Sequence, residues 1–439
     1  MSPPAGIAVV LVALGALLLG ARALQARGAV GAEAARKLVH LGMGCISLAF
    51  PLLFSAAWPV WTLAGLAGAA LCALRFVPVL RRNLGGVLHD VDRASLGEVY
   101  FPLGVAAVFT LSDGEVLRFI VPIALLTFAD AAGALIGKRW GRHHFETLEG
   151  RKSLEGSLAV GGVGFLCVAG PLLAAGHETN AALLAGAVMG LFALILEAIA
   201  WRGMDNIFLP LAAYAQISVF LAAPIPSLAA RLAVLTGLLC VGVVWRRGQV
   251  VDTSARLGAA LALYLFWAVG GWEWLVAPVV LVASYVRLMP SMPRGMPRHN
   301  LVAVICMGSV GLLWCVAQAF APATGLVAPF SLGLATHQAV IAIVRFSQGK
   351  PHWPRLAWWA AGLAQAAATQ GLAFALVDQE GIASLVRVAA GVACGAGATA
   401  GFILWERQLQ APDDLGARWW KQGAAAVVAS LAGFVLMYP

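Results

Sequence analysis

Long apolar runs separated by short polar connections dominate this chain from its first residues to its last. Many of these runs are long enough to cross about 30 Å of hydrocarbon as a helix. We expect about sixteen transmembrane helices on this pattern. They would begin near residues 5, 38, 58, 99, 116, 157, 181, 207, 228, 257, 274, 300, 326, 356, 383 and 421. The predicted fold is therefore an all-α polytopic bundle. Residues 257–289, interrupted by Gly270 and Gly271, fit either a tight hairpin or one kinked helix.

Composition supports a membrane protein. The chain is 61% hydrophobic and 11% charged, whereas a soluble domain is about 25% charged. The first apolar run follows Met1-Ser2-Pro3-Pro4, which lacks a cation, so we expect a retained helix rather than a cleaved leader. The seven cysteines lie in apolar runs without paired metal-ligand spacing, so the sequence indicates neither disulfides nor a zinc site.

The positive charge is concentrated in alternate connections. The net charge is +9, and the cations gather at connections that include residues 36–37, 81–82, 138–152, 246–247 and 294–298. The connection at 177–180 has none. The positive-inside rule then places the basic connections in the cytoplasm and both termini on the extracytoplasmic side, most simply of the inner membrane. Cations spread along inner loops are usual for membrane proteins, so we expect no nucleic-acid partner.

Acidic residues divide the chain into two parts. Those near helix ends lie almost entirely in the first 225 residues, namely Glu98, Asp130, Glu155, Glu197 and Asp205. Later charges lie mostly in loops. We therefore predict one membrane domain over residues 1–245 and a second over 246–439, whose role the sequence does not indicate.

The first chemically dense segment is a helix end. Asp130 stands near the cytoplasmic end of a predicted helix, where an ionised acid is costly unless it is paired or solvated. It could hold Mg²⁺ or orient a hydroxyl, or simply pair with Lys138 or Arg139. Gly133, Gly137 and Gly141 follow at four-residue spacing on one helical face. Close helix packing and close approach of a phosphate explain this spacing equally well.

The segment from Arg151 to Ser157 has the features of an anion site. Ser153 can cap the next helix, leaving free amide groups around Gly156 beside Lys152. Glu155 could favour the helix dipole or share a metal. A basic loop followed by a capped helix is the plainer interpretation.

Further polar residues are predicted on the same side of the membrane. Glu197 lies inside an apolar run, two turns before Asp205 and Asn206. A Glu197–Arg202 ion pair is the structural alternative. Candidates from earlier connections are Arg36, Lys37, His40 and Glu98, which could equally be topology signals and a solvated helix start.

The order of these motifs resembles the CTP-dependent lipid-alcohol kinases, which include phytol, farnesol, dolichol and yeast-type diacylglycerol kinases. The phytol-kinase branch looks most similar. The likeness covers about residues 30–220. It rests on Arg36-Lys37-Leu38-Val39-His40, Gly97-Glu98-Val99-Tyr100-Phe101-Pro102, Asp130 to Gly141, Arg151-Lys152-Ser153-Leu154-Glu155-Gly156-Ser157, and Glu197 with Asp205-Asn206 and Pro210.

This resemblance implies transfer of the γ-phosphate of CTP, with UTP as an alternative donor, to a membrane isoprenoid alcohol. The acceptor could be phytol, geranylgeraniol, farnesol or a longer polyprenol, and the site would face the cytoplasm. Asp130 and Asp205 would hold Mg²⁺, Lys152 would clamp phosphate oxygens, and Glu155 and Glu197 would be further candidates for metal or base. The implied nucleotide-binding residues are Gly133, Gly137, Lys138, Arg139, Gly141, Arg151, Ser153, Gly156, Ser157 and Asn206.

Two other classes remain open from the sequence. A cytidylyltransferase would form a CDP-lipid and release pyrophosphate. A transporter with inverted repeats would explain the many spans, but it requires polar groups at mid-membrane depth in both halves, and the second half offers few.

Overall fold

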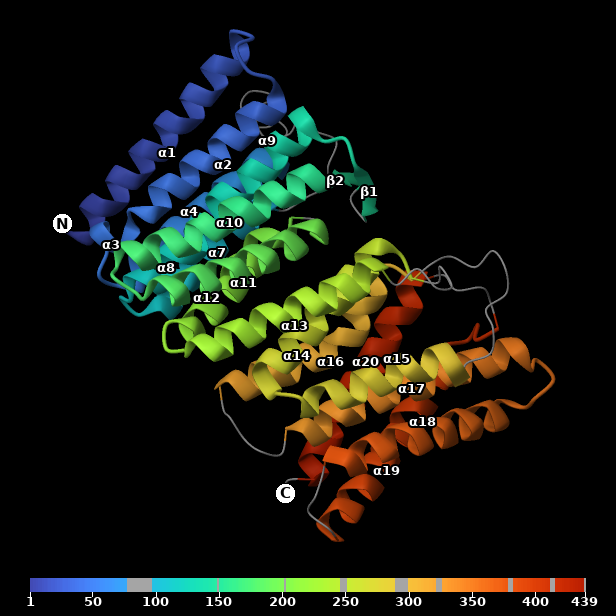
Figure 1. Ribbon diagram of the computed structural model, residues 1–439. Helices are drawn as coiled ribbons and strands as arrows, with labels where there is room; N and C mark the ends of the chain where they lie inside the picture. The colour runs from blue at the N-terminus through green and yellow to red at the C-terminus, as the bar shows by residue number, and fades with distance from the viewer. Residues whose placement is uncertain are drawn as a thin grey trace. The chain divides into compact units, whose positions relative to one another are not determined.

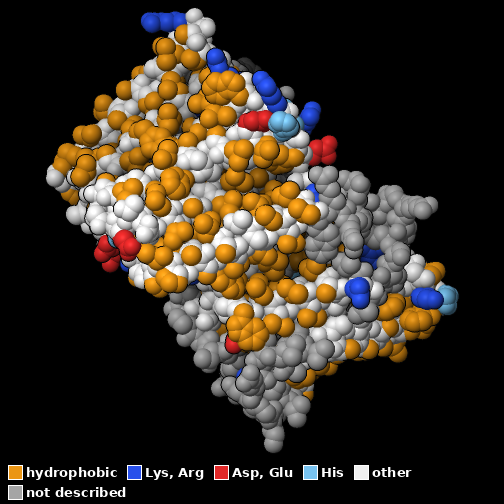
Figure 2. All heavy atoms as spheres, in the orientation of Figure 1, with side chains coloured by type: hydrophobic (Ala, Val, Ile, Leu, Met, Phe, Trp, Pro, Cys, Tyr) orange, Lys and Arg blue, Asp and Glu red, His pale blue; other side chains and the backbone are white. Residues whose placement is uncertain are grey.

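The computed structural model describes residues 1–76, 97–147, 150–200, 203–244, 251–288, 299–320, 326–377, 382–410 and 415–437. Almost all of the described chain is helical (Figure 1), so the predicted all-α architecture is confirmed. On the face shown in Figure 2, hydrophobic side chains cover most of the described surface and charged side chains are few. Such a surface suits contact with lipid rather than with water.

The chain forms two compact units, Met1–Gly237 and Leu238–Pro439. The division between residues 237 and 238 falls within one helix, and the domain border near residue 245 stays a prediction. The helices up to and including that one are α1 (Pro3–Ala26), α2 (Ala32–Leu48), the short α3 (Phe50–Leu53), α4 (Ala57–Phe76), α7 (Gly97–Ser112), α8 (Val116–Ala124), α9 (Asp130–Trp140), α10 (Leu154–Ala174), α11 (Thr179–Ala198), α12 (Asp205–Phe220) and α13 (Ile225–Val244).

The predicted helix starts agree with the structure. Each lies within about six residues of the start of a described helix, because an apolar run must begin close to where its helix enters the hydrocarbon. Within the described residues, ten helices are long and apolar enough to cross a membrane, and residues 57–73, 99–112 and 273–285 form shorter apolar helices. The number of sixteen spans and the sidedness of the termini stay predictions.

One long helical rod in the first unit contains a local irregularity. Helices α8 and α9 are joined by a π-helical turn, η1 (Leu125–Ala129), directly before Asp130. A π turn inserts an extra residue into a helix and so rotates the residues that follow it. Gly44 of α2 packs against Thr127 of this turn, where an added Cβ would overlap the threonine side chain. The sequence contained no signal for the π turn.

A small hairpin interrupts the otherwise helical unit. Strands β1 (His144–Thr147) and β2 (Gly150–Ser153) pair antiparallel, with Phe145 opposite Lys152. The hairpin lies beside the ends of α9 and α10 in Figure 1. Gly150 has φ +116, which favours glycine. The sequence predicted only a basic loop here, because four-residue strands leave too short a periodic pattern to recognise.

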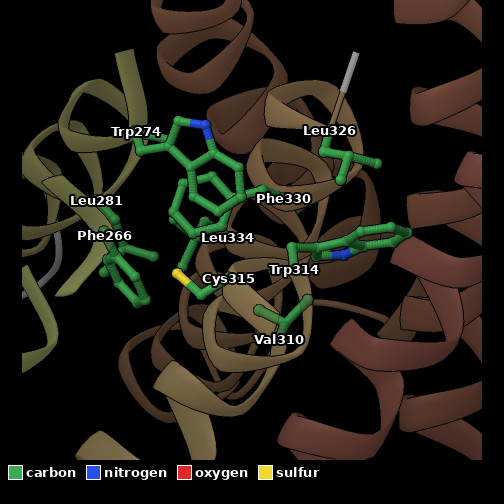
Figure 3. Packing of buried hydrophobic residues seen from close by; sticks show 10 residues of the cluster. Phe266, Trp274, Leu281, Val310, Trp314, Cys315, Leu326, Phe330 and Leu334 are labelled. Carbon is green, nitrogen blue, oxygen red and sulfur yellow. The ribbon is translucent and has the colours of Figure 1, made fainter. Parts of the chain in front are cut away.

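The second unit contains α14 (Thr253–Gly270), α15 (Glu273–Leu288), α16 (Leu301–Phe320), α17 (Val327–Gly349), α18 (Arg355–Val377), α19 (Ile382–Trp405) and α20 (Leu415–Met437). The described part of residues 257–289, up to residue 288, thus forms two helices, separated at Gly271 with φ +77. Aromatic packing fills the core around α17, where Trp274 stacks on Phe330 at a centroid distance of 4.6 Å (Figure 3).

The interior of α17 is more polar than the sequence pattern suggested. Thr336, His337 and Gln338 are almost fully buried. The Gln370 amide of α18 donates to Gln338 Oε1 at 2.9 Å, and Gln422 of α20 lies 3.2 Å from His337 Nδ1. A count of charged residues in loops does not detect such side chains, because they are uncharged and form hydrogen bonds with one another inside the bundle.

Candidate active site

Three carboxylates from three helices meet in the first unit. Asp130 opens α9, Glu197 lies in the last turn of α11, and Asp205 opens α12. One carboxylate oxygen from each lies within 4.8 Å of the others. The Asp130 and Glu197 side chains are only 14% and 19% exposed, and Asp205 is partly buried. Carboxylate oxygens at this spacing are the ligands that a hydrated Mg²⁺ ion prefers, so the donor set fits such an ion.

Helix α2 supplies two partners for Asp130. Lys37 Nζ lies 2.7 Å from Asp130 Oδ2, and both side chains are less than 15% exposed. His40 Nε2 lies 3.3 Å from the same oxygen and 3.2 Å from the Leu126 carbonyl oxygen in the π turn. Both of these groups are acceptors, so the arrangement places a proton on Nε2. The edge of Phe101 packs on the imidazole at a centroid distance of 5.0 Å.

Lys152 at the end of the hairpin pairs with Glu197. Its ammonium donates to Glu197 Oε1 at 2.7 Å and also to the Glu197 backbone carbonyl. Burial alone would lower the pKa of Lys152, but the carboxylates of Glu197, Asp205 and Asp130 raise that pKa above its usual value of 10.5. The lysine therefore stays charged beside all three acids.

The charges in this group do not balance. Three acids face two lysines, and among the described residues Asp205 has no ion-pair partner. A buried excess of negative charge is unfavourable unless a cation compensates it. The group therefore favours binding of a metal cation, and the lysines favour polyanionic ligands such as phosphates.

Glu155 lies outside this group and has a different set of partners. Its carboxylate accepts hydrogen bonds from the backbone amides of Arg142 at 3.0 Å and His143 at 3.2 Å, and it lies 2.7 Å from His143 Nδ1. These contacts join the start of α10 to the segment that leads into the hairpin. Ser153 caps α10 by accepting from the Gly156 amide at 3.2 Å, as its position predicted. Glu155 thus helps to hold the loop that presents Lys152.

The glycines of α9 bring it close to α10. A Cβ at Gly156 would lie 2.8 Å from the Gly133 carbonyl oxygen, and one at Gly137 would lie 3.0 Å from Ser153 Oγ. One at Gly141 would lie 2.7 Å from the same hydroxyl oxygen. The packing interpretation of the glycine spacing therefore has a clear structural basis. A role in binding nucleotide stays a prediction.

The remaining sequence candidates occupy varied positions. Arg151, Lys138 and Arg139 are exposed, and the Arg139 guanidinium lies 5.3 Å from the Trp140 ring centroid. Ser157 is buried in the first turn of α10, whereas Asn206 is half-buried and donates to the Gly203 carbonyl at 3.2 Å. Arg36 is half-buried on α2, one residue before Lys37. Glu98 lies at the start of α7, and its side chain is outside the described part of the chain.

The ion pairs differ from the alternatives that the sequence suggested. Asp130 pairs with Lys37 rather than with Lys138 or Arg139, and Glu197 pairs with Lys152. Arg202, the expected partner of Glu197, lies outside the described residues. Sequence reasoning missed Phe101 as a neighbour of the site. The presence of Lys37 and His40 on one helical face, three residues apart, was an available signal for their shared contact with Asp130.

Comparison with known proteins assigns the first unit to a family. Residues 4–203 match the cytidylyltransferase family. The phytol kinase of Synechocystis sp. is 31% identical over 216 residues, which cover 48% of this chain and 90% of that kinase. The chain belongs to the CTP-dependent polyprenol and phytol kinase family. No solved structure matches this chain. The family match contains Lys37, Asp130, Lys152 and Glu197, and it ends before the second unit begins.

Proposed function

We propose that this protein is an integral membrane kinase that transfers the γ-phosphate of CTP to the hydroxyl of an isoprenoid alcohol. The observation that carries the proposal is the cluster of three carboxylates bordered by Lys37 and Lys152. Similarity to a phytol kinase supports the choice of a lipid alcohol as acceptor. Phosphoryl transfer depends on positioning and on charge stabilisation, and this cluster can provide both.

Each charged residue has a role in this proposal. Asp130, Glu197 and Asp205 would hold Mg²⁺, which when bound would supply positive charge to neutralise the phosphates. Lys152 and Lys37 would turn toward the triphosphate and stabilise the negative charge that spreads over its oxygens during transfer. Exposed Arg139 and Arg151 would attract the nucleotide from the aqueous side.

The acceptor hydroxyl would lie beside Asp130. Its oxygen forms a bond to the γ-phosphorus while the bond from that phosphorus to the β,γ-bridging oxygen breaks, and CDP leaves. The hydroxyl proton passes to the Asp130 carboxylate as the new bond forms. His40, whose Nε2 lies 3.3 Å from Asp130 Oδ2, would fix the position of that carboxylate.

Labelled nucleotide tests the proposal directly. The full-length protein in nanodiscs is incubated with Mg²⁺, γ-labelled CTP, UTP or ATP, and a panel of farnesol, geranylgeraniol, phytol, dolichol and diacylglycerol. We expect labelled lipid monophosphate from CTP and an isoprenoid alcohol. Absence of label from every lipid would contradict the proposal.

A cytidylyltransferase is the second candidate, because the matching family model is described by that activity. Such an enzyme would join the α-phosphorus to a lipid phosphate and release pyrophosphate. CTP labelled at the α-phosphate would then yield labelled lipid, whereas γ-labelled CTP would yield labelled pyrophosphate. The paired labels distinguish the two reactions in one experiment.

A further inference from the structure

An apolar groove lies within the first unit. It is formed by α1, α2, α3, α4 and α7 and, with its open mouth included, encloses about 460 Å³. Its lining residues are apolar except for Ser47. The Ser47 hydroxyl donates to the Met43 carbonyl at 2.9 Å, so even this side chain has its donor satisfied within its own helix. The groove therefore presents hydrocarbon along its length.

One end of the groove leads to the candidate active site. Met43 and Ser47 line it from α2 and Phe50 lines it from α3. His40 lies on the same face of α2, one turn before Met43. Phe101 lines it from α7 and contacts the His40 ring, which in turn lies 3.3 Å from Asp130. A chain of contacts thus connects the hydrocarbon lining to a reacting carboxylate.

We propose that this groove binds the prenyl chain of the acceptor alcohol and limits the length of chain that the enzyme accepts. This inference rests on the proposed kinase function. A prenyl alcohol has one hydroxyl at the end of a long apolar chain, and the groove has one polar end and an otherwise apolar lining. With the chain in the groove, the hydroxyl reaches the His40 and Asp130 end.

The order of groove residues along α4 follows from the chain connection. Only three residues separate α3 from α4, so the start of α4 lies close to Phe50 in α3. Ala64 therefore lies further from His40 than Ala67 does. From His40 to Ser47, α2 rises about 10 Å, and the groove continues beyond α2 to Phe50.

Three alanines spaced by three residues on α4 provide a matched test. Ala64 and Ala67 line the groove, whereas Ala70 is exposed and does not line it. Each is changed to leucine in the full-length protein, and kcat/KM is measured with geraniol, farnesol and geranylgeraniol. We expect Ala64→Leu to reduce kcat/KM for geranylgeraniol about tenfold or more while sparing geraniol, because added methyl groups block the far end. Ala67→Leu should also reduce kcat/KM for farnesol. Ala70→Leu should leave kcat/KM unchanged for all three alcohols.

Equal losses for all three alcohols, or the same chain-length shift in Ala70→Leu, would overturn the inference. Val60→Ala, which enlarges the groove at its far end, should improve use of the longer alcohols. This gain in activity guards against a folding defect as the explanation of the leucine variants.

A binding measurement separates this inference from the kinase proposal. A diazirine analogue of geranylgeraniol is crosslinked to the wild-type protein, and labelled peptides are located by mass spectrometry. Labelling of α2 and α4 that free geranylgeraniol displaces would support the groove even if no phosphate were transferred. Labelling confined to other helices would contradict the inference. The inference would also be contradicted if a saturated phospholipid reduced the labelling of α2 and α4 as effectively as free geranylgeraniol does.

Discussion

Lys37 of α2 donates a hydrogen bond of 2.7 Å to Asp130, which follows it by 93 residues in the chain. Asp130 directly follows the π turn, and both side chains of the pair are less than 15% exposed. The pair joins the second helix of the unit to the helix that carries the first candidate metal ligand. The same lysine would be released toward phosphate when a metal occupies the carboxylates.

The first prediction concerns the energetics of this pair. Lys37→Met should destabilise the protein by about 3 kcal/mol, because it leaves a largely buried carboxylate without its lysine. The double variant Lys37→Met with Asp130→Asn should regain most of that loss, since neither charge remains, yet stay inactive. Thermal unfolding in detergent measures the stability. Additive destabilisation in the double variant would show that the pair is not coupled.

The carboxylates should control the dependence on magnesium. Glu197→Gln and Asp205→Asn each remove one anionic ligand, so we expect the Mg²⁺ concentration for half-maximal activity to rise by about tenfold or more. Glu178→Gln serves as control because Glu178 is exposed at the opposite end of α11. Unchanged Mg²⁺ titrations in both cluster variants would remove these acids from the metal site.

Lys152 should be needed for the chemical step. Lys152→Met should lower kcat about 100- to 1,000-fold, because a preorganised positive charge is lost where phosphate charge develops. The same change at Lys138, which is exposed at the end of α9, should cost far less. Steady-state kinetics with CTP compares kcat of the Lys152→Met and Lys138→Met variants. Full activity of Lys152→Met would refute the role of Lys152 in the chemical step.

The contribution of Lys152 to stability should be constant at neutral and mildly alkaline pH. Its pKa is raised by Glu197, Asp205 and Asp130, although burial opposes this. Its stabilising effect is therefore complete below the unfolded-state pKa of about 10.4 and is lost only as pH rises through the higher folded-state pKa. The difference in unfolding temperature between wild type and Lys152→Met should stay flat from about pH 6 to 9. A decline within that range would mean that the lysine loses its proton there.

The contact of α9 with α10 should depend on glycine at one position but not at its neighbour. Gly156→Ala should destabilise by about 1–3 kcal/mol, because the new Cβ would lie 2.8 Å from a backbone oxygen that cannot move freely. Gly162→Ala on the same helix has open space around its Cβ and should be neutral or slightly stabilising. Melting temperatures of the two variants provide the comparison, and equal values would contradict tight packing.

The sequence located most helices and several residues of the candidate site, but not their pairing. Asp130, Lys152, Glu197 and Asp205 stood out because ionisable groups are costly in apolar segments. Lys37 and His40 were included only as flanking candidates, since basic residues at helix ends are common topology signals. The sequence did not distinguish Glu155 from the other acidic candidates. In the structure its carboxylate accepts hydrogen bonds from the backbone amides of residues 142 and 143.

The sequence by itself determined that this chain is a helical membrane protein, because hydropathy acts locally along each segment and sets where helices begin. It also supplied the motif order that resembles the lipid-alcohol kinases. Only the tertiary structure decided which cation faces which acid, since those contacts join residues up to 93 positions apart and depend on helix rotation. The apolar groove near His40 was likewise decided by the tertiary structure, because several helices that are separate in the sequence line it.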